Sequence, residues 1–112
     1  MTRATDKEKG YFKAYRAKNL ARILAYDRAR NDKHRLLRMA FVDAAHADGC
    51  VDCGNKNLSV LQSDHVRGVK VDEVAAMAAT RTPFHILFAE IDKCETRCAN
   101  CHALVTRQRR AK

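Results

Sequence analysis

The spacing of apolar and polar positions predicts two helices in the N-terminal half of the chain. Residues 6–30 contain no Pro and a single Gly, and their larger apolar side chains recur as a broken stripe at helical spacing. Asn31 and Asp32 are good N-cap residues, so we expect a second helix from about Lys33 to Ala47. The apolar face of this second helix is expected to consist of Leu36, Leu37, Ala40, Phe41 and Ala44.

The chain changes character after Gly49, where short elements replace the long helical pattern. Leu58 to Gln62 predict a short strand, and residues 66–68 are expected to turn into a return strand. Residues 71–80 predict a short helix. Thr82 is expected to cap a further helix, with Pro83 at its first position, that runs through Ile91. These two helices are interpreted as a helical insertion that packs a small core.

The last predicted element is a helix over residues 99–110, which gives an α+β fold class for the whole chain. The chain has 112 residues, only 6% of them aromatic and none of them Trp, so its apolar core is small. A staple, meaning a cross-link such as a bound metal ion, would help it fold. We expect two parts, a basic helical N-terminal arm over residues 1–48 and a stapled domain over residues 49–112.

Charge is unevenly distributed, and its pattern favours a polyanionic partner. The formal net charge is +9; residues 1–49 carry 12 Lys/Arg against 6 Asp/Glu, residues 50–92 carry 4 against 6, and residues 93–112 carry 6 against 1. Two basic ends around a slightly acidic middle suit nucleic acid, and DNA is the expected partner. The first thirty residues lack the apolar segment of a signal peptide, and no apolar run approaches the ~18 residues of a membrane span. We therefore expect a cytoplasmic protein that does not enter the membrane.

The five cysteines predict a metal site. Cys50 and Cys53 form one CxxC pair, and Cys98 and Cys101 form another. Thiols stay reduced in the cytoplasm, where paired CxxC motifs bind metal more often than they form disulfides. Four thiolates are a common ligand set of structural Zn²⁺. Cys94 is then surplus; it is either a small buried side chain, which we favour, or an alternative ligand.

With four thiolates assigned, His102 is free for another task. Asp64 and His65 precede it in the chain, and the three residues together could form a second site. A carboxylate and an imidazole suit a divalent ion such as Mg²⁺, Mn²⁺ or Ni²⁺ with water completing its shell. The second histidine need not bind that ion if it takes a proton from water.

Three motifs in this order, CVDCG, SDHV and KCETRCANCH, resemble the HNH endonucleases of phage and bacteria, in the zinc-containing ββα-metal class. The resemblance covers residues 49–110. It implies a β-hairpin and a helix around one catalytic divalent ion, with a cysteine-bound zinc holding hairpin to helix. It further implies that His65 is the general base and that Asp64 and His102 are the two metal ligands.

One position departs from the family pattern. Many HNH enzymes carry an Asn five residues before the first cysteine of the second pair, where it steadies the loop that bears the base. Lys93 occupies that position here. Asn100, inside the second CxxC, is the candidate for a related role.

The implied activity is metal-dependent hydrolysis of DNA phosphodiester bonds. His65 would remove a proton from water, and the ion would neutralise charge on the phosphate. Five arginines are candidates for contacts to DNA phosphates: Arg67, Arg97, Arg107, Arg109 and Arg110. His34, His46 and His85 lack such neighbours in the sequence and are expected to be exposed or to lie on helix faces.

Two other functions share part of this pattern. A non-catalytic, zinc-stapled DNA-binding module would need the four cysteines and the basic ends but not Asp64, His65 or His102. A redox CxxC protein is disfavoured, because no strand–CxxC–helix pattern accompanies the first pair. The sequence leaves open whether the protein is a monomer or a homodimer, and whether it nicks DNA or cuts both strands.

Overall fold

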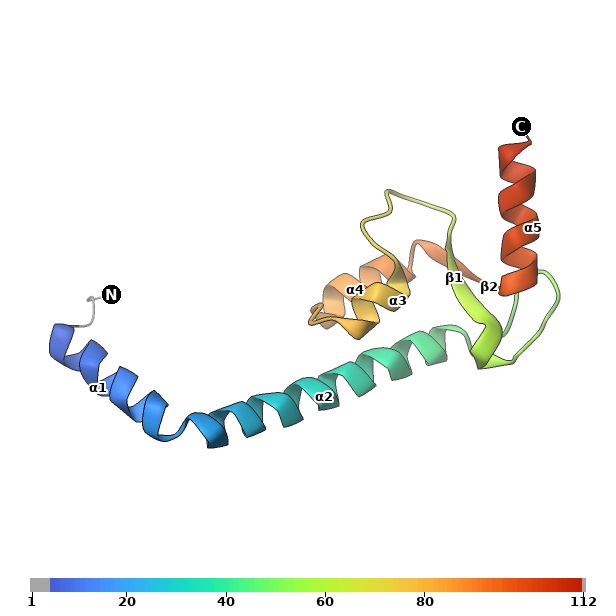
Figure 1. The fold of residues 1–112 in the computed structure, drawn as a ribbon. Coiled ribbons are helices and arrows are strands. Elements are labelled where there is room, and N and C mark those ends of the chain that lie inside the picture. Colours follow the sequence, from blue (N-terminus) through green and yellow to red (C-terminus); the bar gives the residue numbers. More distant parts are fainter. Residues whose placement is uncertain (1–4, 112) are drawn as a thin grey trace. The chain divides into compact units, whose positions relative to one another are not determined.

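The structure is a computed structural model that describes residues 5–111, and its fold is mixed α and β (Figure 1). The chain divides into two compact units, residues 1–33 and residues 34–112. Contacts thus group residues 34–48 with the C-terminal part of the chain, whereas the sequence analysis assigns them to the N-terminal arm. Among residues 5–111 no helix combines the length and apolar character needed to cross a membrane.

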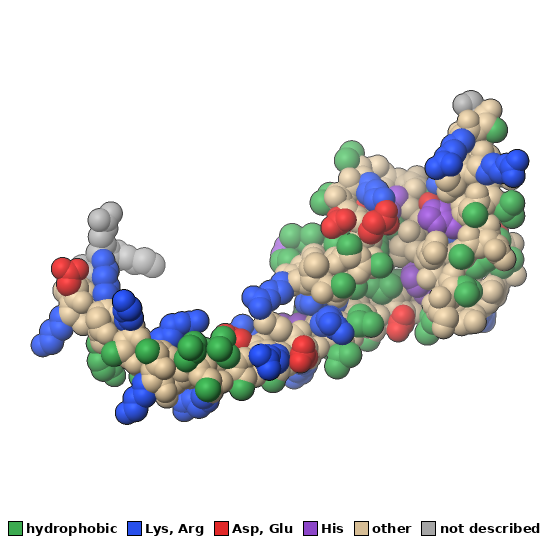
Figure 2. Space-filling model, viewed as in Figure 1, with side chains coloured by type: hydrophobic (Ala, Val, Ile, Leu, Met, Phe, Trp, Pro, Cys, Tyr) green, Lys and Arg blue, Asp and Glu red, His purple; other side chains and the backbone are tan. Residues whose placement is uncertain are grey.

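The N-terminal unit contains helix α1 (Asp6–Lys18) and the first part of helix α2 (Leu20–Ala45). Thr5 begins α1 with a capping box, because its hydroxyl accepts from the Glu8 amide and the Glu8 carboxylate accepts from the Thr5 amide. The helix ends at Asn19, whose side chain donates to the Tyr15 carbonyl at 2.8 Å. Lys and Arg side chains are scattered along this unit, with apolar side chains between them (Figure 2).

The predicted boundary between the first two helices is wrong. α2 runs without interruption through Asn31 and Asp32, and the break falls at Asn19 instead. An Asn or Asp inside a helix costs at most about 0.7 kcal/mol relative to Ala, and no Pro or Gly occurs between residues 20 and 45 to enforce a stop. The predicted apolar face is also displaced, because Leu36 is 64% exposed and Leu37 is 38% exposed.

The C-terminal unit is organised by a two-stranded antiparallel sheet of β1 (Leu61–His65) and β2 (Cys94–Cys98). Its register pairs Leu61 with Cys98 at one end and His65 with Cys94 at the other. The predicted return strand at residues 66–68 is therefore wrong. The strand that pairs with β1 comes after the insertion, and residues 58–60, expected to begin β1, form a short 3₁₀ turn (η1, Leu58–Val60).

The predicted helical insertion is present between the two strands, as α3 (Val74–Ala79) and α4 (Phe84–Ile91). Val74, Met77 and Leu87 form its buried core. The second part of α2 packs against it, since the ring of Phe41 lies edge-on to Phe88 with centroids 4.9 Å apart. Thr82 does not cap α4: the cap position is Pro83, without a side-chain hydrogen bond, and the Thr82 hydroxyl lies 3.0 Å from that of Thr80.

The helix predicted over residues 99–110 is present as α5 (Ala99–Arg110), and it contributes the side chains that contact one face of the sheet. Successive residues of a strand point to opposite faces. Gln62 and Asp64 accordingly contact residues of α5. Leu61, Ser63 and His65 point the other way, where Leu61 packs in a second small core with Cys50 and Cys98.

Candidate metal centre and catalytic residues

The first CxxC pair lies in a tight turn after α2. The Cys50 amide donates to the Asn55 carbonyl at 2.9 Å, and the Gly54 amide donates to the Cys50 carbonyl at 2.9 Å. Gly54 and Gly49 have φ of 75° and 84°, which residues with a Cβ adopt only at a cost. At Gly49 a Cβ would also lie 2.9 Å from the Asn55 carbonyl oxygen, so a side chain there would open the turn.

The second pair spans the junction of β2 and α5. Cys98 is the N-cap of α5, and its Sγ accepts from the Cys101 amide at 3.4 Å. The Val51 amide donates to the Thr96 carbonyl at 2.9 Å, which ties the first turn to β2. Both pairs are therefore fixed by backbone hydrogen bonds close to the cysteines themselves.

The four predicted ligands meet in one cluster. The Sγ atoms of Cys50, Cys53, Cys98 and Cys101 all lie within 4.8 Å of one another. The Sγ atoms of Cys53 and Cys98 are 3.7 Å apart. Four thiolates at about 2.3 Å from a tetrahedral zinc have sulfurs about 3.8 Å apart, so this spacing fits zinc. The four cysteines can thus bind a structural metal ion such as zinc.

Cys94 is not part of this cluster. It is half-buried against the core of the insertion, and its thiol donates to the Glu90 carbonyl at 3.3 Å. Burial, followed by the negative charges of Glu90 and Asp64, raises the pKa of the Cys94 thiol to about 11. Its position outside the cluster and against the core agrees with the packing role that the sequence favoured for it.

Asp64 lies on the α5 side of the sheet, next to His102. The His102 Nε2 is 3.4 Å from the Asp64 Oδ1, and the His102 Nδ1 is 2.8 Å from the Gln62 side-chain oxygen. Asp64 is only 3% exposed. The structure thus brings together the two residues expected to bind the second ion.

Positive charge surrounds the Asp64 carboxylate. Arg97 donates to its Oδ2 at 2.6 Å, and Arg109 donates to both oxygens at 3.0 Å. Burial raises the pKa of Asp64, but the hydrogen bonds and charge of Arg109, with smaller contributions from Arg97 and His102, outweigh it and leave the pKa below its usual value. Asp64 is therefore an ionised carboxylate that is already paired with two guanidinium groups, and a metal ion bound there would have to displace them.

His65 lies on the opposite side of the strand from Asp64. Its Nε2 is 2.8 Å from the Oε2 of Glu90, a residue of α4 that is only 2% exposed. None of the hydrogen bonds described for residues 5–111 joins His65 to the side chain of Asp64 or His102. Asp64 and His102 are therefore in contact, whereas His65, although next to Asp64 in the chain, is hydrogen-bonded to Glu90 instead.

Glu90 is the residue of this region that the sequence analysis missed. Burial raises its pKa, but hydrogen bonds from Lys93, the Val71 amide and His65 outweigh burial and lower the pKa to about 2. The signal in the sequence was a lone carboxylate in the apolar helix FHILFAEI, three residues after the fully buried Leu87 and so on the same helix face.

Lys93 and Asn100 differ in their surroundings. The Lys93 ammonium donates to Glu90 at 2.8 Å and to the Val69 carbonyl at 2.7 Å, so it contacts the loop that follows His65. Asn100 is exposed in the first turn of α5, and the bonds described for residues 5–111 give it no link to that loop.

The candidate DNA-binding arginines fall into two groups. Arg97 is 11% exposed at its side chain and is surrounded by the carboxylates of Asp52, Asp64 and Glu95. Arg109 forms an ion pair with Asp64, although the Arg109 side chain is 47% exposed. Arg67 donates to the Asp92 carbonyl at 2.6 Å. The last two candidates, Arg107 and Arg110, are exposed on α5.

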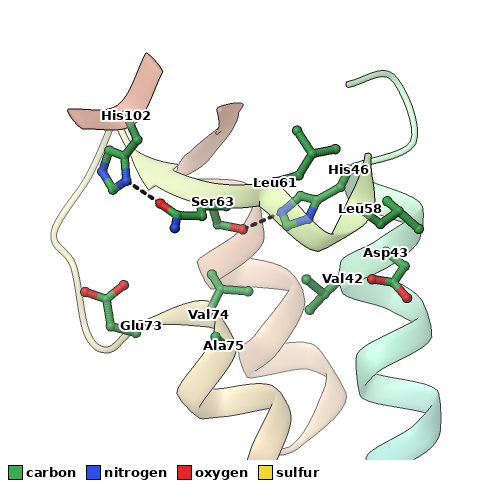
Figure 3. A pocket seen from close by; sticks show the side chains of 11 residues that line it. Val42, Asp43, His46, Leu58, Leu61, Ser63, Glu73, Val74, Ala75 and His102 are labelled. Atoms are coloured by element: carbon green, nitrogen blue, oxygen red, sulfur yellow. Dashed lines mark hydrogen bonds between the residues drawn. The ribbon is translucent and has the colours of Figure 1, made fainter. Parts of the chain in front are cut away.

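A cavity of about 410 Å³ lies beside β1, and Figure 3 shows the residues that line it. His102 points to Gln62 at one end, and His46 approaches Ser63, with His46 Nε2 2.9 Å from the Ser63 hydroxyl. The expectation that His46 is exposed or lies on a helix face is wrong: it follows the end of α2 and is only 6% exposed. Burial lowers its pKa, despite the nearby charge of Asp43.

Comparisons of this chain with protein-family models, with curated proteins and with solved structures give no match.

Proposed function

We propose that the protein is a metal-dependent endonuclease of the HNH type that hydrolyses phosphodiester bonds of DNA. The observation that carries this proposal is the pairing of Asp64 and His102, 3.4 Å apart, beside a cysteine cluster that joins the sheet to α5. Two cis ligands of an octahedral Mg²⁺, each about 2.1 Å from the ion, are about 3 Å apart, so the pair fits a shared divalent ion.

The ionisation of Asp64 supports the same assignment. Arg97 and Arg109 now neutralise its carboxylate, and a divalent ion would replace these guanidinium groups as its partner. Asp64 and His102 would supply two protein ligands, and oxygens of water and phosphate would complete the shell. A divalent ion bound there supplies charge neutralisation at the phosphate and stabilises the departing oxygen.

The protein's own groups account for the other requirements of hydrolysis. His65, at the end of β1, takes a proton from the attacking water, a contribution worth about 10² to 10⁴ in rate. Arg107 and Arg110 on α5 hold phosphates through charge, which fixes the position of the DNA without reading its sequence. The α5 helix carries both these arginines and His102.

The second candidate is a non-catalytic zinc-stapled module that binds DNA. One observation favours it: Asp64 and His65 point to opposite faces of β1, and each is already engaged, Asp64 by arginines and His65 by Glu90. This candidate needs the cysteine cluster and the basic surface but no ion at Asp64.

Cleavage of supercoiled plasmid distinguishes the two functions. Wild-type protein, Asp64→Ala, His65→Ala and the exposed-histidine control His85→Ala are each incubated with plasmid and Mg²⁺, Mn²⁺ or Ni²⁺, and zinc content is measured in parallel. The nuclease predicts nicking by the wild type and by His85→Ala, and none by the other two variants at unchanged zinc content. Wild-type protein that retains plasmid on a gel but nicks it with none of the ions would instead establish the binding module.

A further inference from the structure

The carboxylate of Glu90 has no role in the proposed reaction so far, yet its burial costs hydration free energy. A buried charge loses several kcal/mol of hydration unless partners compensate it. Three donors meet this carboxylate: the Lys93 ammonium at 2.8 Å, the Val71 amide at 3.0 Å and the His65 Nε2 at 2.8 Å. A Leu at this position would fill the core without any such requirement.

The contact with Glu90 determines which nitrogen of His65 carries the proton. An ionised carboxylate only accepts hydrogen bonds, so the His65 Nε2 must be protonated to donate to it. In the neutral ring the lone pair then resides on Nδ1. Glu90 is ionised over the whole neutral range, because its pKa is lowered to about 2.

The other ring nitrogen remains accessible. The hydrogen bonds described for residues 5–111 include none to the Nδ1 of His65. No buried side-chain nitrogen or oxygen among these residues lacks a partner, so an Nδ1 without one is in contact with solvent. A basic nitrogen in contact with water is what proton abstraction from water requires.

The loop after His65 is fastened to the same group of residues. The Val66 amide donates to the Lys93 carbonyl at 2.9 Å, and the Lys93 ammonium donates to the Val69 carbonyl at 2.7 Å. Further along the loop, the Val71 amide donates to the Glu90 carboxylate. His65 and the residues that follow it are thus held at both ends by Glu90 and Lys93.

We propose that Glu90 is the positioning residue of His65: its carboxylate holds the protonated Nε2 and leaves Nδ1 as the basic nitrogen facing water. This inference rests on the proposed nuclease function, because it assigns Glu90 a part in preparing the base. Glu90 itself touches neither DNA nor the ion.

The first test needs no variant of Glu90. Protein labelled with ¹⁵N-histidine, loaded with zinc and held at about pH 8, where free imidazole is neutral, is studied by long-range ¹H–¹⁵N correlation. The signals of His65 are identified by their loss in His65→Ala. We expect a protonated Nε2 and an unprotonated Nδ1. A ring with the proton on Nδ1 overturns the inference, whether or not any Glu90 variant folds.

The second test compares the kinetics of Glu90→Gln with those of Glu73→Gln, the same chemical change at an exposed glutamate that pairs with Lys70. His65 and Lys93 contact different oxygens of Glu90, so a Gln in the same position, with one oxygen replaced by a donating NH₂, cannot accept from both. We expect Glu90→Gln to lower kcat for nicking by about tenfold or more, within the ~10² to 10⁴ that a general base is worth, with KM for plasmid within about twofold. Glu73→Gln should change neither.

The outcomes separate the inference from the function beneath it. If the wild type nicks DNA but Glu90→Gln, folded and zinc-loaded, keeps its kcat, the positioning role is wrong and the nuclease proposal stands. If the wild type nicks DNA under no condition, the proposed function fails and the role of Glu90 fails with it. A lowered kcat with an altered His65 tautomer supports both.

Discussion

Replacement of Cys53 by Ser tests whether the cysteine cluster holds the C-terminal unit together through a metal ion. Cys53 is exposed, so its side chain adds little by packing, and an ordinary surface substitution costs within about 0.5 kcal/mol. Structural zinc contributes about 10–16 kcal/mol of apparent binding free energy, which is folding free energy in a small domain. One of four equal ligands then accounts for about 3 kcal/mol.

The predicted effect is as large as the loss of the one large apolar side chain in the local core. The apolar cluster next to the cysteines contains Leu61 as its single large buried side chain, and such a residue contributes about 1.5–3 kcal/mol. A loss of about 3 kcal/mol lowers Tm by about 12 to 24 °C in a domain of this size. Packing alone would predict almost no change for an exposed thiol.

The assay measures bound zinc and thermal unfolding by circular dichroism for wild type, Cys53→Ser and Cys94→Ser. The last variant is the matched control, because Cys94 lies outside the cluster. We expect Cys53→Ser to lose zinc and most of its thermal stability, and Cys94→Ser to keep its zinc. The reasoning is refuted if Cys53→Ser unfolds within a few degrees of the wild type and if a chelator leaves the wild-type Tm unchanged.

Three further predictions concern the core, acid stability and DNA binding. Leu87→Ala removes a side chain that is 0% exposed and should cost about 2–5 kcal/mol, read from urea unfolding. The pKa of Glu90 is lowered in the folded protein to about 2. The ionised carboxylate therefore stabilises the fold fully above its ordinary pKa near 4.5, and this contribution is lost as the pH falls from there towards 2. Glu90→Gln should lack this part of the acid transition in pH-dependent unfolding. Arg107→Ala and Arg110→Ala should each weaken DNA binding alike on unrelated sequences and reduce the salt slope of the association constant by about 1, and an unchanged slope in fluorescence titrations would remove them from the interface.

The sequence could predict those features that depend on nearby residues. The CxxC spacing identified the four cysteines that the fold gathers, since two residues between thiols suit a single turn around one ion. The helix over residues 99–110 was predicted with its bounds, because no Pro or Gly interrupts the chain there and its Ala, Leu, Gln and Arg residues favour helix. The insertion was recognised from its apolar spacing in the same way.

The elements that the sequence failed to predict depend on distant partners. β2 carries Cys, Glu, Thr and Arg, with no apolar alternation, and it becomes a strand because β1 offers its edge to residues 94–98. The continuity of α2 through Asn31 and Asp32 likewise reflects a competition between local caps and helix extension that composition does not decide.

What the sequence by itself determined was therefore the chemistry available: four thiols, a carboxylate and two histidines at fixed spacings, and basic charge at both ends. The tertiary structure decided which groups meet. It joined Asp64 to His102 across the sheet and α5, and it placed His65 against Glu90 of α4 on the other side. The physical reason is the two-residue period of the strand, which sends neighbouring side chains to opposite faces, while the packing of helices on those faces chooses their partners.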